Sequence, residues 1–206
     1  MCILIGMKQN RDPDHTRHTI LKAAAQEIHL HGFQAASLSR ILATTELTKG
    51  ALYYHFPNKQ ALGYAVLEEV IAVQGRETWI SPLEQCTGPV DCLQSMISTR
   101  FKNMTEQELL RGCPLNNLAL EMSPIDEGFR RRVVAIYDRW TKGLAAILAR
   151  GQGSGSVSLA IDPFKVATFI VASIAGIRSL AKTTQTSAVL DASADALIDY
   201  LETLRR

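Results

Sequence analysis

The sequence lacks most of the side chains that enzymes use for acid–base chemistry and for metal binding. All of its histidines lie in the first 55 residues, so the long remainder of the chain has no imidazole. The sequence also contains no Gly-rich phosphate loop and no cluster of His and Cys at metal-ligand spacing. These absences disfavour an enzyme, and they predict no catalytic residues, no metal site and no cofactor.

Cysteines are few, and their spacing indicates neither a disulfide framework nor a zinc site. The four cysteines are Cys2, Cys86, Cys92 and Cys113, with no CxxC pair and no secretory signal. The apolar opening Met1–Met7 is too short for the hydrophobic part of a signal peptide, and Met7 is an alternative start. We therefore expect a reduced, cytoplasmic protein.

No apolar run is long enough to cross a membrane, and no segment alternates apolar and polar residues as a half-buried strand does. The most apolar stretch extends from Val166 to Ile177, a run of twelve residues that ends before Arg178, whereas a membrane-spanning helix needs about 20. Apolar residues recur instead at spacings of three and four along almost the whole chain. The sequence thus predicts an all-α protein without a membrane span.

Charge is distributed unevenly along the chain, although the net charge is only +2. Residues 1–60 contain seven Lys and Arg against four Asp and Glu, whereas residues 61–206 contain fifteen against sixteen. The basic excess therefore lies in the N-terminal part, which also holds all the histidines.

The first 60 residues predict three helices with a turn between the second and the third. The first helix covers about 14–31 and stops at Gly32. Ser37 caps a short second helix, and Thr48 caps a third helix over 49–56. The third helix is too short and too polar-aromatic to be a core element, which is typical of a helix–turn–helix that reads DNA.

The rest of the chain predicts a larger helical part. A fourth helix follows the cap residue Asn58 and ends near 79–82. Further helix starts are predicted at Pro89, after 112–114, at Ser123-Pro124, at Asp162-Pro163 and in the last segment. A flexible Gly/Ser-rich loop is predicted at 151–158. About nine helices result for the whole chain.

A specific motif stands at the predicted third helix. It is the run Thr48-Lys49-Gly50-Ala51-Leu52-Tyr53-Tyr54-His55-Phe56, followed by Lys59 and Leu62. Together with Ile20, Ala24, Gly32-Phe33, Ser37-Leu38 and Ile41, it makes residues 16–67 resemble the DNA-binding domain of the TetR family of transcriptional regulators. This resemblance covers about a quarter of the chain. The family usually has Ala-Gly at the turn, where this chain has Thr45-Glu46.

The resemblance implies a set of DNA-binding residues in and around the third helix. They are Ser37, Thr48, Lys49, Gly50, Ala51, Tyr53, Tyr54, His55 and Lys59. Lys49 can donate to guanine and specify sequence, whereas Tyr54 and Lys59 can reach phosphates and position the domain. For Tyr53 and Phe56 the alternative is a place in the core of the domain.

The resemblance also implies a homodimer on palindromic double-stranded DNA, whose two reading helices lie about 34–36 Å apart. The domains expected are an N-terminal tail at 1–13, a helix–turn–helix domain at 14–60, and an effector-binding and dimerisation domain at 61–206. In the family the last two helices form the dimer interface. The residues expected there are Phe169, Ser173, Ile177, Leu190, Leu197 and Leu201.

We also expect a small-molecule effector, which releases the protein from its operator. Apolar and aromatic residues dominate the middle helices, so the effector is expected to be small and mostly apolar or aromatic. The candidate ligand-binding residues are Met96, Phe101, Met104, Cys113, Leu118, Glu121, Tyr137, Trp140 and Phe169. The alternatives are simple core packing for Tyr137 and Trp140, and pairing with an arginine for Glu121.

Two other functions stay open from the sequence. Cys113 lies in Gly112-Cys113-Pro114 at a break between helices, where a thiol at a helix start can react with an electrophile or an oxidant. The other alternative is a DNA binder without an effector, whose C-terminal part would be packed solid. The sequence does not distinguish a repressor from an activator, although a repressor is the function we favour.

Overall fold

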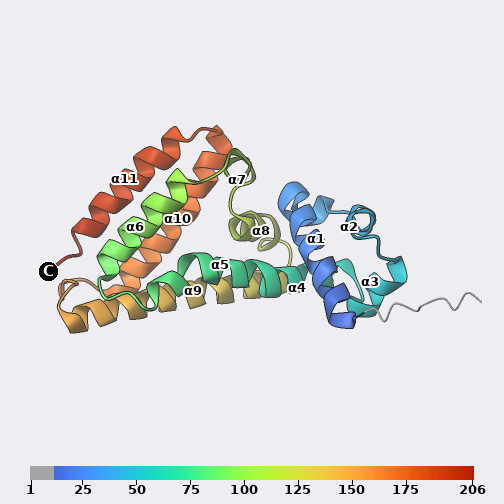
Figure 1. Cartoon of the computed structure of the whole chain (residues 1–206), viewed down its shortest axis with the longest axis horizontal. Helices are drawn as coiled ribbons and strands as arrows, with labels where there is room; N and C mark the ends of the chain where they lie inside the picture. Colours follow the sequence, from blue (N-terminus) through green and yellow to red (C-terminus); the bar gives the residue numbers. More distant parts are fainter. Residues whose placement is uncertain (1–11) are drawn as a thin grey trace, which may run out of the picture. The chain divides into compact units, whose positions relative to one another are not determined.

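A computed structural model of the chain describes residues 12–206 (Figure 1). The alternative start at Met7 and most of the predicted tail at 1–13 lie outside the described residues. Within residues 12–206 the backbone is helical apart from turns and one isolated β-bridge, between Val157 and Arg205. The all-α prediction is therefore confirmed. The chain divides into two compact units, of which the first ends at Val66 and the second covers Leu67–Arg206.

The first unit is a bundle of short helices around one long helix. Its elements are α1 (Pro13–Ala35), α2 (Leu38–Thr45), α3 (Lys49–His55) and α4 (Lys59–Ala65). Helix α1 contacts each of the other three. Its apolar face is fully buried at Ile20 and Ala24, and the core of the unit also contains Leu52 of α3 and Leu62 of α4.

Local signals set most ends of these helices as predicted, but α1 continues to Ala35, past the stop predicted at Gly32. Gly32 has a φ of 78°, which only glycine adopts readily, and it interrupts the helical conformation near the end of α1. The side chains of Ser37, Thr48 and Asn58 each accept a hydrogen bond from a backbone N–H in the first turn of the helix they precede. These caps allow helices of only seven or eight residues.

A buried carboxylate ties α1 to the start of α2. Glu27 accepts a hydrogen bond from the backbone N–H of Ser37 at 2.9 Å and one from Arg40 Nε at 2.7 Å. Burial raises the pKa of Glu27, but the bonds from Ser37 and Arg40 lower it more, so the net pKa lies below the ordinary value. The charged form of Glu27 therefore stabilises the position of α2 on α1.

The second unit consists of long helices with short connectors. Its elements are the π-helical turn η1 (Val66–Ile71), α5 (Ala72–Trp79), the 3-10 turn η2 (Ser81–Leu83), α6 (Pro89–Lys102), α7 (Glu106–Arg111), α8 (Pro114–Met122), α9 (Glu127–Ser154), α10 (Pro163–Thr184) and α11 (Ala188–Glu202). Helices α6, α9, α10 and α11 supply most of one large apolar core. The densest packing joins α9 to α10 and α6 to α11.

One helix and two helix boundaries in this unit differ from the prediction. The sequence pattern does not predict helix α7, which a capping box between Thr105 and Glu108 starts. Helix α9 begins after Asp126, whose side chain caps it, and not at Ser123-Pro124. It also continues through Gly151 to Ser154, because Gly151 is buried against the side chains of Pro89 and Val157. The predicted loop at 151–158 is thus partly helix.

Two cysteines are joined, in contrast to the expectation of a fully reduced protein. The sulfurs of Cys86 and Cys92 form a disulfide across six residues of sequence. The turn between η2 and α6 brings the two side chains together, although they do not form a CxxC motif. Among the described cysteines, Cys113 is the free one.

Helix α10 is longer than the apolar run in the sequence indicates. Its 22 residues are, by length and composition alone, sufficient to cross a membrane. However, Val166, Ala167, Ile170 and Ile177 belong to the core of the second unit, and Arg178 is buried there as well. Helix α10 is therefore a core helix of this unit. Ile177 packs within the protomer, and its expected dimer contact stays a prediction.

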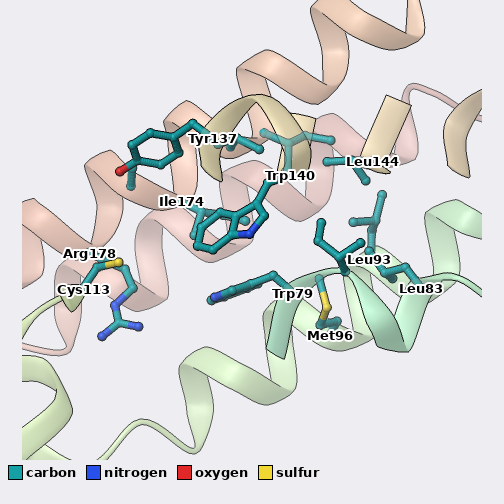
Figure 2. Close-up of a pocket in the computed structure, with 14 residues that line it drawn as sticks. Trp79, Leu83, Leu93, Met96, Cys113, Tyr137, Trp140, Leu144, Ile174 and Arg178 are labelled. Carbon is teal, nitrogen blue, oxygen red and sulfur yellow. The ribbon is translucent and has the colours of Figure 1, made fainter. Parts of the chain in front are cut away.

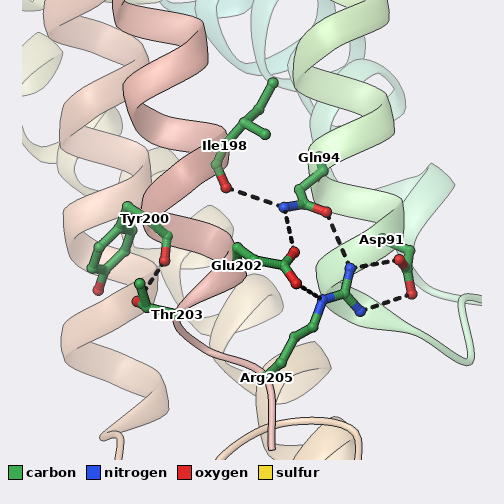
Figure 3. Close-up of polar contacts among 7 residues, drawn as sticks. All are labelled: Asp91, Gln94, Ile198, Tyr200, Glu202, Thr203 and Arg205. Atoms are coloured by element: carbon green, nitrogen blue, oxygen red, sulfur yellow. Dashed lines mark hydrogen bonds and ion pairs between the residues drawn. The ribbon is translucent and has the colours of Figure 1, made fainter.

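The last helix is fastened to α6 by apolar and polar contacts. Leu190, Leu197 and Leu201 point into the core and are at most 4% exposed. Beyond the end of α11, Arg205 pairs with Asp91 of α6 at 2.7 Å, and Gln94 of α6 donates to the carbonyl of Ile198 at 3.1 Å (Figure 3). The stripe of these three leucines packs within the protomer, and their expected dimer contacts stay predictions.

Replacing Glu27 by Gln should lower the stability of the first unit by about 1–2 kcal/mol at neutral pH, since the Arg40 contact then loses its charge. The folded pKa of Glu27 is lowered, so its contribution is present above the ordinary pKa and is lost as the pH falls through the folded pKa. Thermal unfolding of the full chain should therefore show a difference between wild type and variant that shrinks on acidification. Exposed Glu46→Gln is the control, and a pH-independent difference would contradict the assignment.

Candidate DNA-binding helix and ligand cavity

The start of α3 is the most exposed part of the helix–turn–helix. Thr48, Lys49 and Gly50 are all exposed. A Cβ added at Gly50 would meet only the Oγ1 of Thr48, at 3.9 Å, so another backbone can approach closely here. Lys49 Nζ lies 5.8 Å from the centre of the Tyr53 ring. The geometry leaves these groups available to a DNA groove.

The aromatic residues of α3 divide into an inner and an outer set. Phe56 is 2% exposed and belongs to the core, which is the alternative considered for this residue. Tyr53 and Tyr54 are exposed, and Tyr54 is the more exposed of the two, at 79%. His55 is half-buried and contacts the edge of Tyr54 at a centroid distance of 5.0 Å. Half-buried Ala51 completes the predicted set on this helix.

The other two predicted DNA-binding residues have contacts inside the first unit. Lys59 Nζ donates to the carbonyl of Gln34 at 2.9 Å and lies 5.0 Å from the centre of the Phe33 ring. Ser37 caps α2. Both residues thus hold helices in place, a role that the sequence pattern alone did not indicate for Lys59.

The turn between α2 and α3 contains an uncommon conformation. Glu46 ends α2 with a φ of 54°, in the left-handed region that favours glycine. This is the position at which the chain departs from the Ala-Gly expected by resemblance. The turn therefore keeps the glycine-like conformation with a glutamate in it.

The second unit contains an apolar cavity of about 40 Å³ (Figure 2). It lies among α5, η2, α6, α9 and α10, together with the start of α8. Its lining residues are Trp79, Ile80, Leu83, Leu93, Met96, Cys113, Tyr137, Trp140, Leu144, Ile170, Val171, Ile174, Ala175 and Arg178. Because sites for drug-sized ligands measure about 300–1,000 Å³, this cavity suits a small ligand unless side chains move.

Three polar side chains line this otherwise apolar cavity. Figure 2 shows Arg178 and Cys113 at one end and Leu83 and Leu93 towards the other. Tyr137 donates to Asn116 Oδ1 over a long 3.4 Å. Burial raises the pKa of Tyr137, so its hydroxyl stays protonated, and burial lowers the pKa of Arg178.

Both tryptophans of the chain lie at the cavity. Trp140 of α9 packs directly on α5, where a Cβ added at Gly75 would lie within 3 Å of two atoms of its indole ring. Gly75 thus provides the space that the ring occupies. Trp79 contacts Phe101 edge-on at a centroid distance of 6.3 Å. Because the chain contains no other tryptophan, its intrinsic tryptophan fluorescence reports on this cavity.

The predicted ligand-binding residues are brought together only in part. Met96, Cys113, Tyr137 and Trp140 line the cavity. Phe101 and Leu118 are buried, Met104 and Glu121 are half-buried, and Phe169 is half-exposed on α10, all outside the lining.

The sequence reasoning missed several lining residues, above all Trp79 and Arg178. The sequence pattern places Trp79 only near the end of a helix, and Arg178 only at the end of an apolar run. The signal that could have found Arg178 is its isolation, because a single charge within an apolar core helix needs a partner or a function.

Family comparisons agree with this geometry. Residues 20–66 match the model described as bacterial regulatory proteins of the tetR family, and residues 89–197 match that of the tetracyclin repressor-like C-terminal domain. The HTH-type transcriptional repressor DhaR of a Mycobacterium species is 29% identical over 161 residues, which cover 78% of this chain and 79% of DhaR.

Two further relatives are similar over most of their length. An HTH-type transcriptional regulator encoded in the lacX 3′ region of Lactococcus lactis is 28% identical over 89% of this chain and 91% of its own. A TetR transcriptional regulator from Chloroflexus aurantiacus has a crystal structure that superposes with a TM-score of 0.82 at 26% identity, covering 94% of this chain and 98% of that one.

The chain combines a helix–turn–helix unit, whose reading helix is exposed, with a helical unit that has its own cavity. This combination defines a DNA-binding transcriptional regulator. The two domain matches and the relatives agree on the same class. The chain belongs to the TetR family.

Proposed function

We propose that the protein is a cytoplasmic repressor, that its homodimer binds a palindromic operator, and that a small effector in the cavity of the second unit releases it. The observation that carries this proposal is the apolar cavity, because a DNA binder without an effector would have a second unit packed solid. DhaR, which the chain resembles along most of its length, is named a repressor.

The proposed division of labour on DNA follows from exposure. Lys49 is exposed at the N-terminus of the reading helix, where a long cationic donor can reach guanine O6 and N7. Tyr54 projects from the same helix and can bind a phosphate. Lys59 Nζ donates to the carbonyl of Gln34 and Lys59 is the first residue of α4, so we expect it to contribute charge near the DNA backbone and not to read the sequence.

The proposed dimer interface uses the outer face of α10. Phe169 and Leu180 on this helix are about half-exposed, and the small residues Ala172 and Gly176 lie exposed between them. Small residues between larger apolar ones allow two helices to approach closely, and half-buried Ser173 lies on the same stretch. This face replaces the leucine stripe of α11, whose side chains are already buried.

A second candidate function is favoured by the position of Cys113. Its thiol lines the cavity near Arg178, so an electrophile or oxidant that enters the cavity would meet a free cysteine beside a cation. In this alternative the covalent modification of Cys113, and not the occupancy of the cavity, would release the operator.

Lys49→Ala should weaken binding to the operator by about 1–3 kcal/mol and relax the preference at one base position, whereas Lys59→Ala should weaken binding to all DNA alike. The reason is that only Lys49 stands where base edges can be reached. Fluorescence anisotropy with DNA flanking the gene and with scrambled DNA would measure both. Equal losses on the two DNAs for Lys49→Ala would contradict the assignment.

Gly176→Arg should convert the dimer to a monomer. An added Cβ at Gly176 meets no atom of the protomer within 4 Å, so the arginine would clash only with a partner helix. Gly153→Arg on α9 is the matched control, because that glycine is equally open. Sedimentation velocity should show a monomer for the first variant and a dimer for the control; an intact Gly176→Arg dimer would remove this face of α10 from the interface.

Cys113→Ser separates the two candidate functions. If the cavity binds its effector non-covalently, the variant should still be released from DNA by that effector, with an affinity for the operator like that of the wild type. Release by an electrophile such as N-ethylmaleimide would be lost only if the thiol is the sensor. Anisotropy titrations with both kinds of compound would measure this, and loss of release by the electrophile alone would favour the second candidate.

A further inference from the structure

A buried guanidinium that pairs with no carboxylate of residues 12–206 lies at the cavity. Arg178 is the only charged residue of α10 between Lys165 and Lys182, and it is 7% exposed. Its Nη2 donates to the carbonyl of Gly112 at 2.8 Å and lies 3.5 Å from that of Glu108. Its Nε is buried and has no hydrogen-bond partner in the described part of the chain. Two carbonyl contacts made by one nitrogen leave most of the five donors of the guanidinium unused.

The carboxylate that acts on Arg178 is already engaged elsewhere. Glu108 forms an ion pair with Arg100 at 2.7 Å and accepts a hydrogen bond from the backbone N–H of Thr105 at 3.0 Å. Burial raises the pKa of Glu108, but the contacts with Thr105 and Arg100 lower it more, so the group is charged at neutral pH. Its charge is thus shared with Arg100 at a capping box and is not paired with the guanidinium of Arg178.

The other lining groups favour an anion and not a second cation. The hydroxyl of Tyr137 stays protonated and neutral, with its hydrogen directed to Asn116 Oδ1, and Cys113 carries a thiol at the same end of the cavity as Arg178. Among the described residues, no Asp or Glu lines the cavity. A buried positive charge costs free energy unless an opposite charge compensates it, and an anionic ligand would provide that charge.

We infer that the ligand of this cavity is a small monocarboxylate whose carboxylate pairs with Arg178 and whose apolar body lies against Trp79 and Trp140. A single guanidinium neutralises one negative charge, which favours a carboxylate over a phosphate dianion. The inference rests on the proposed function and deepens it, because it adds a charged group to an effector expected to be mostly apolar.

The apolar part of the ligand must be small or must displace side chains. The cavity holds about 40 Å³ as it stands. Met96 lines it and is flexible, so its thioether can move to enlarge the space. Benzoate and hexanoate are suitable probes, with benzamide and hexanamide as neutral analogues of nearly the same shape.

The test is a titration of the full-length protein with each of the four probes, followed by the fluorescence of Trp79 and Trp140. We expect at least one carboxylate to bind about tenfold more tightly than its amide, because a charge-assisted hydrogen-bonded pair is about that much stronger than a neutral one. In Arg178→Gln, which keeps a donor for Gly112, this preference should disappear while binding of the amide persists.

The matched control is Lys182→Gln, one helical turn further along α10. It removes a positive charge nearby, but Lys182 bonds to Asn117 at 3.2 Å and does not line the cavity. The preference for the carboxylate should survive in this variant. Thermal unfolding of both variants shows whether Arg178 acts only as a structural contact. In that case Arg178→Gln would be less stable, and it would bind the carboxylate and the amide with equally reduced affinity.

A wild-type protein that binds the amides as tightly as the carboxylates, or binds none of the four probes, would overturn the inference. Equal weakening of both probes by Arg178→Gln would overturn it as well. The same probes added to the operator complex separate this inference from the proposed function. A carboxylate that binds but leaves the operator complex intact supports the inference and contradicts effector release. Release of the operator by neutral apolar compounds alone supports effector release and contradicts the inference.

Discussion

The packing of α10 against α9 is the contact on which the second unit depends. Both helices are more than 20 residues long, and they bury apolar side chains along their common length, among them Leu144 and Ile147 of α9 and Ala167 and Ile170 of α10. Each large buried side chain of this kind contributes about 1.5–3 kcal/mol. The shorter helices then cover the faces that this pair leaves open, and the cavity is lined from both members of the pair.

Arg178 lies on this packed helix, so its charge cannot turn to solvent without opening the core. The same guanidinium holds the carbonyl of Gly112, where α7 ends with a positive φ. An anion bound to Arg178 would therefore act on the turn that precedes Cys113 and α8.

In the first unit, short-range contacts carry most of the architecture. Side-chain caps start α2, α3 and α4, and the buried carboxylate of Glu27 fixes the start of α2 on α1. Leu52 of α3 and the residue that follows this helix, Phe56, are buried in the core, so α3 is held in place while its first turn remains exposed. A rigid support with an exposed helix start is what sequence-specific contact with a groove requires.

The sequence by itself determined the helical class, the caps at Ser37, Thr48 and Asn58, and the exposed run at the start of α3, because each depends on residues within one turn of each other. It also identified Met96, Cys113, Tyr137 and Trp140 as residues of one region. Only the tertiary structure decided which stripe is core and which is surface: Leu197 and Phe169 have the same apolar character, but the first is buried in the core and the second is left half-exposed. The disulfide between Cys86 and Cys92 is local, but it depends on the conformation of the turn before α6, which residue spacing does not reveal. Contacts between distant segments placed Pro89 against Gly151 of α9 and Arg178 at the cavity, since periodicity along one helix carries no information about which other helix it meets.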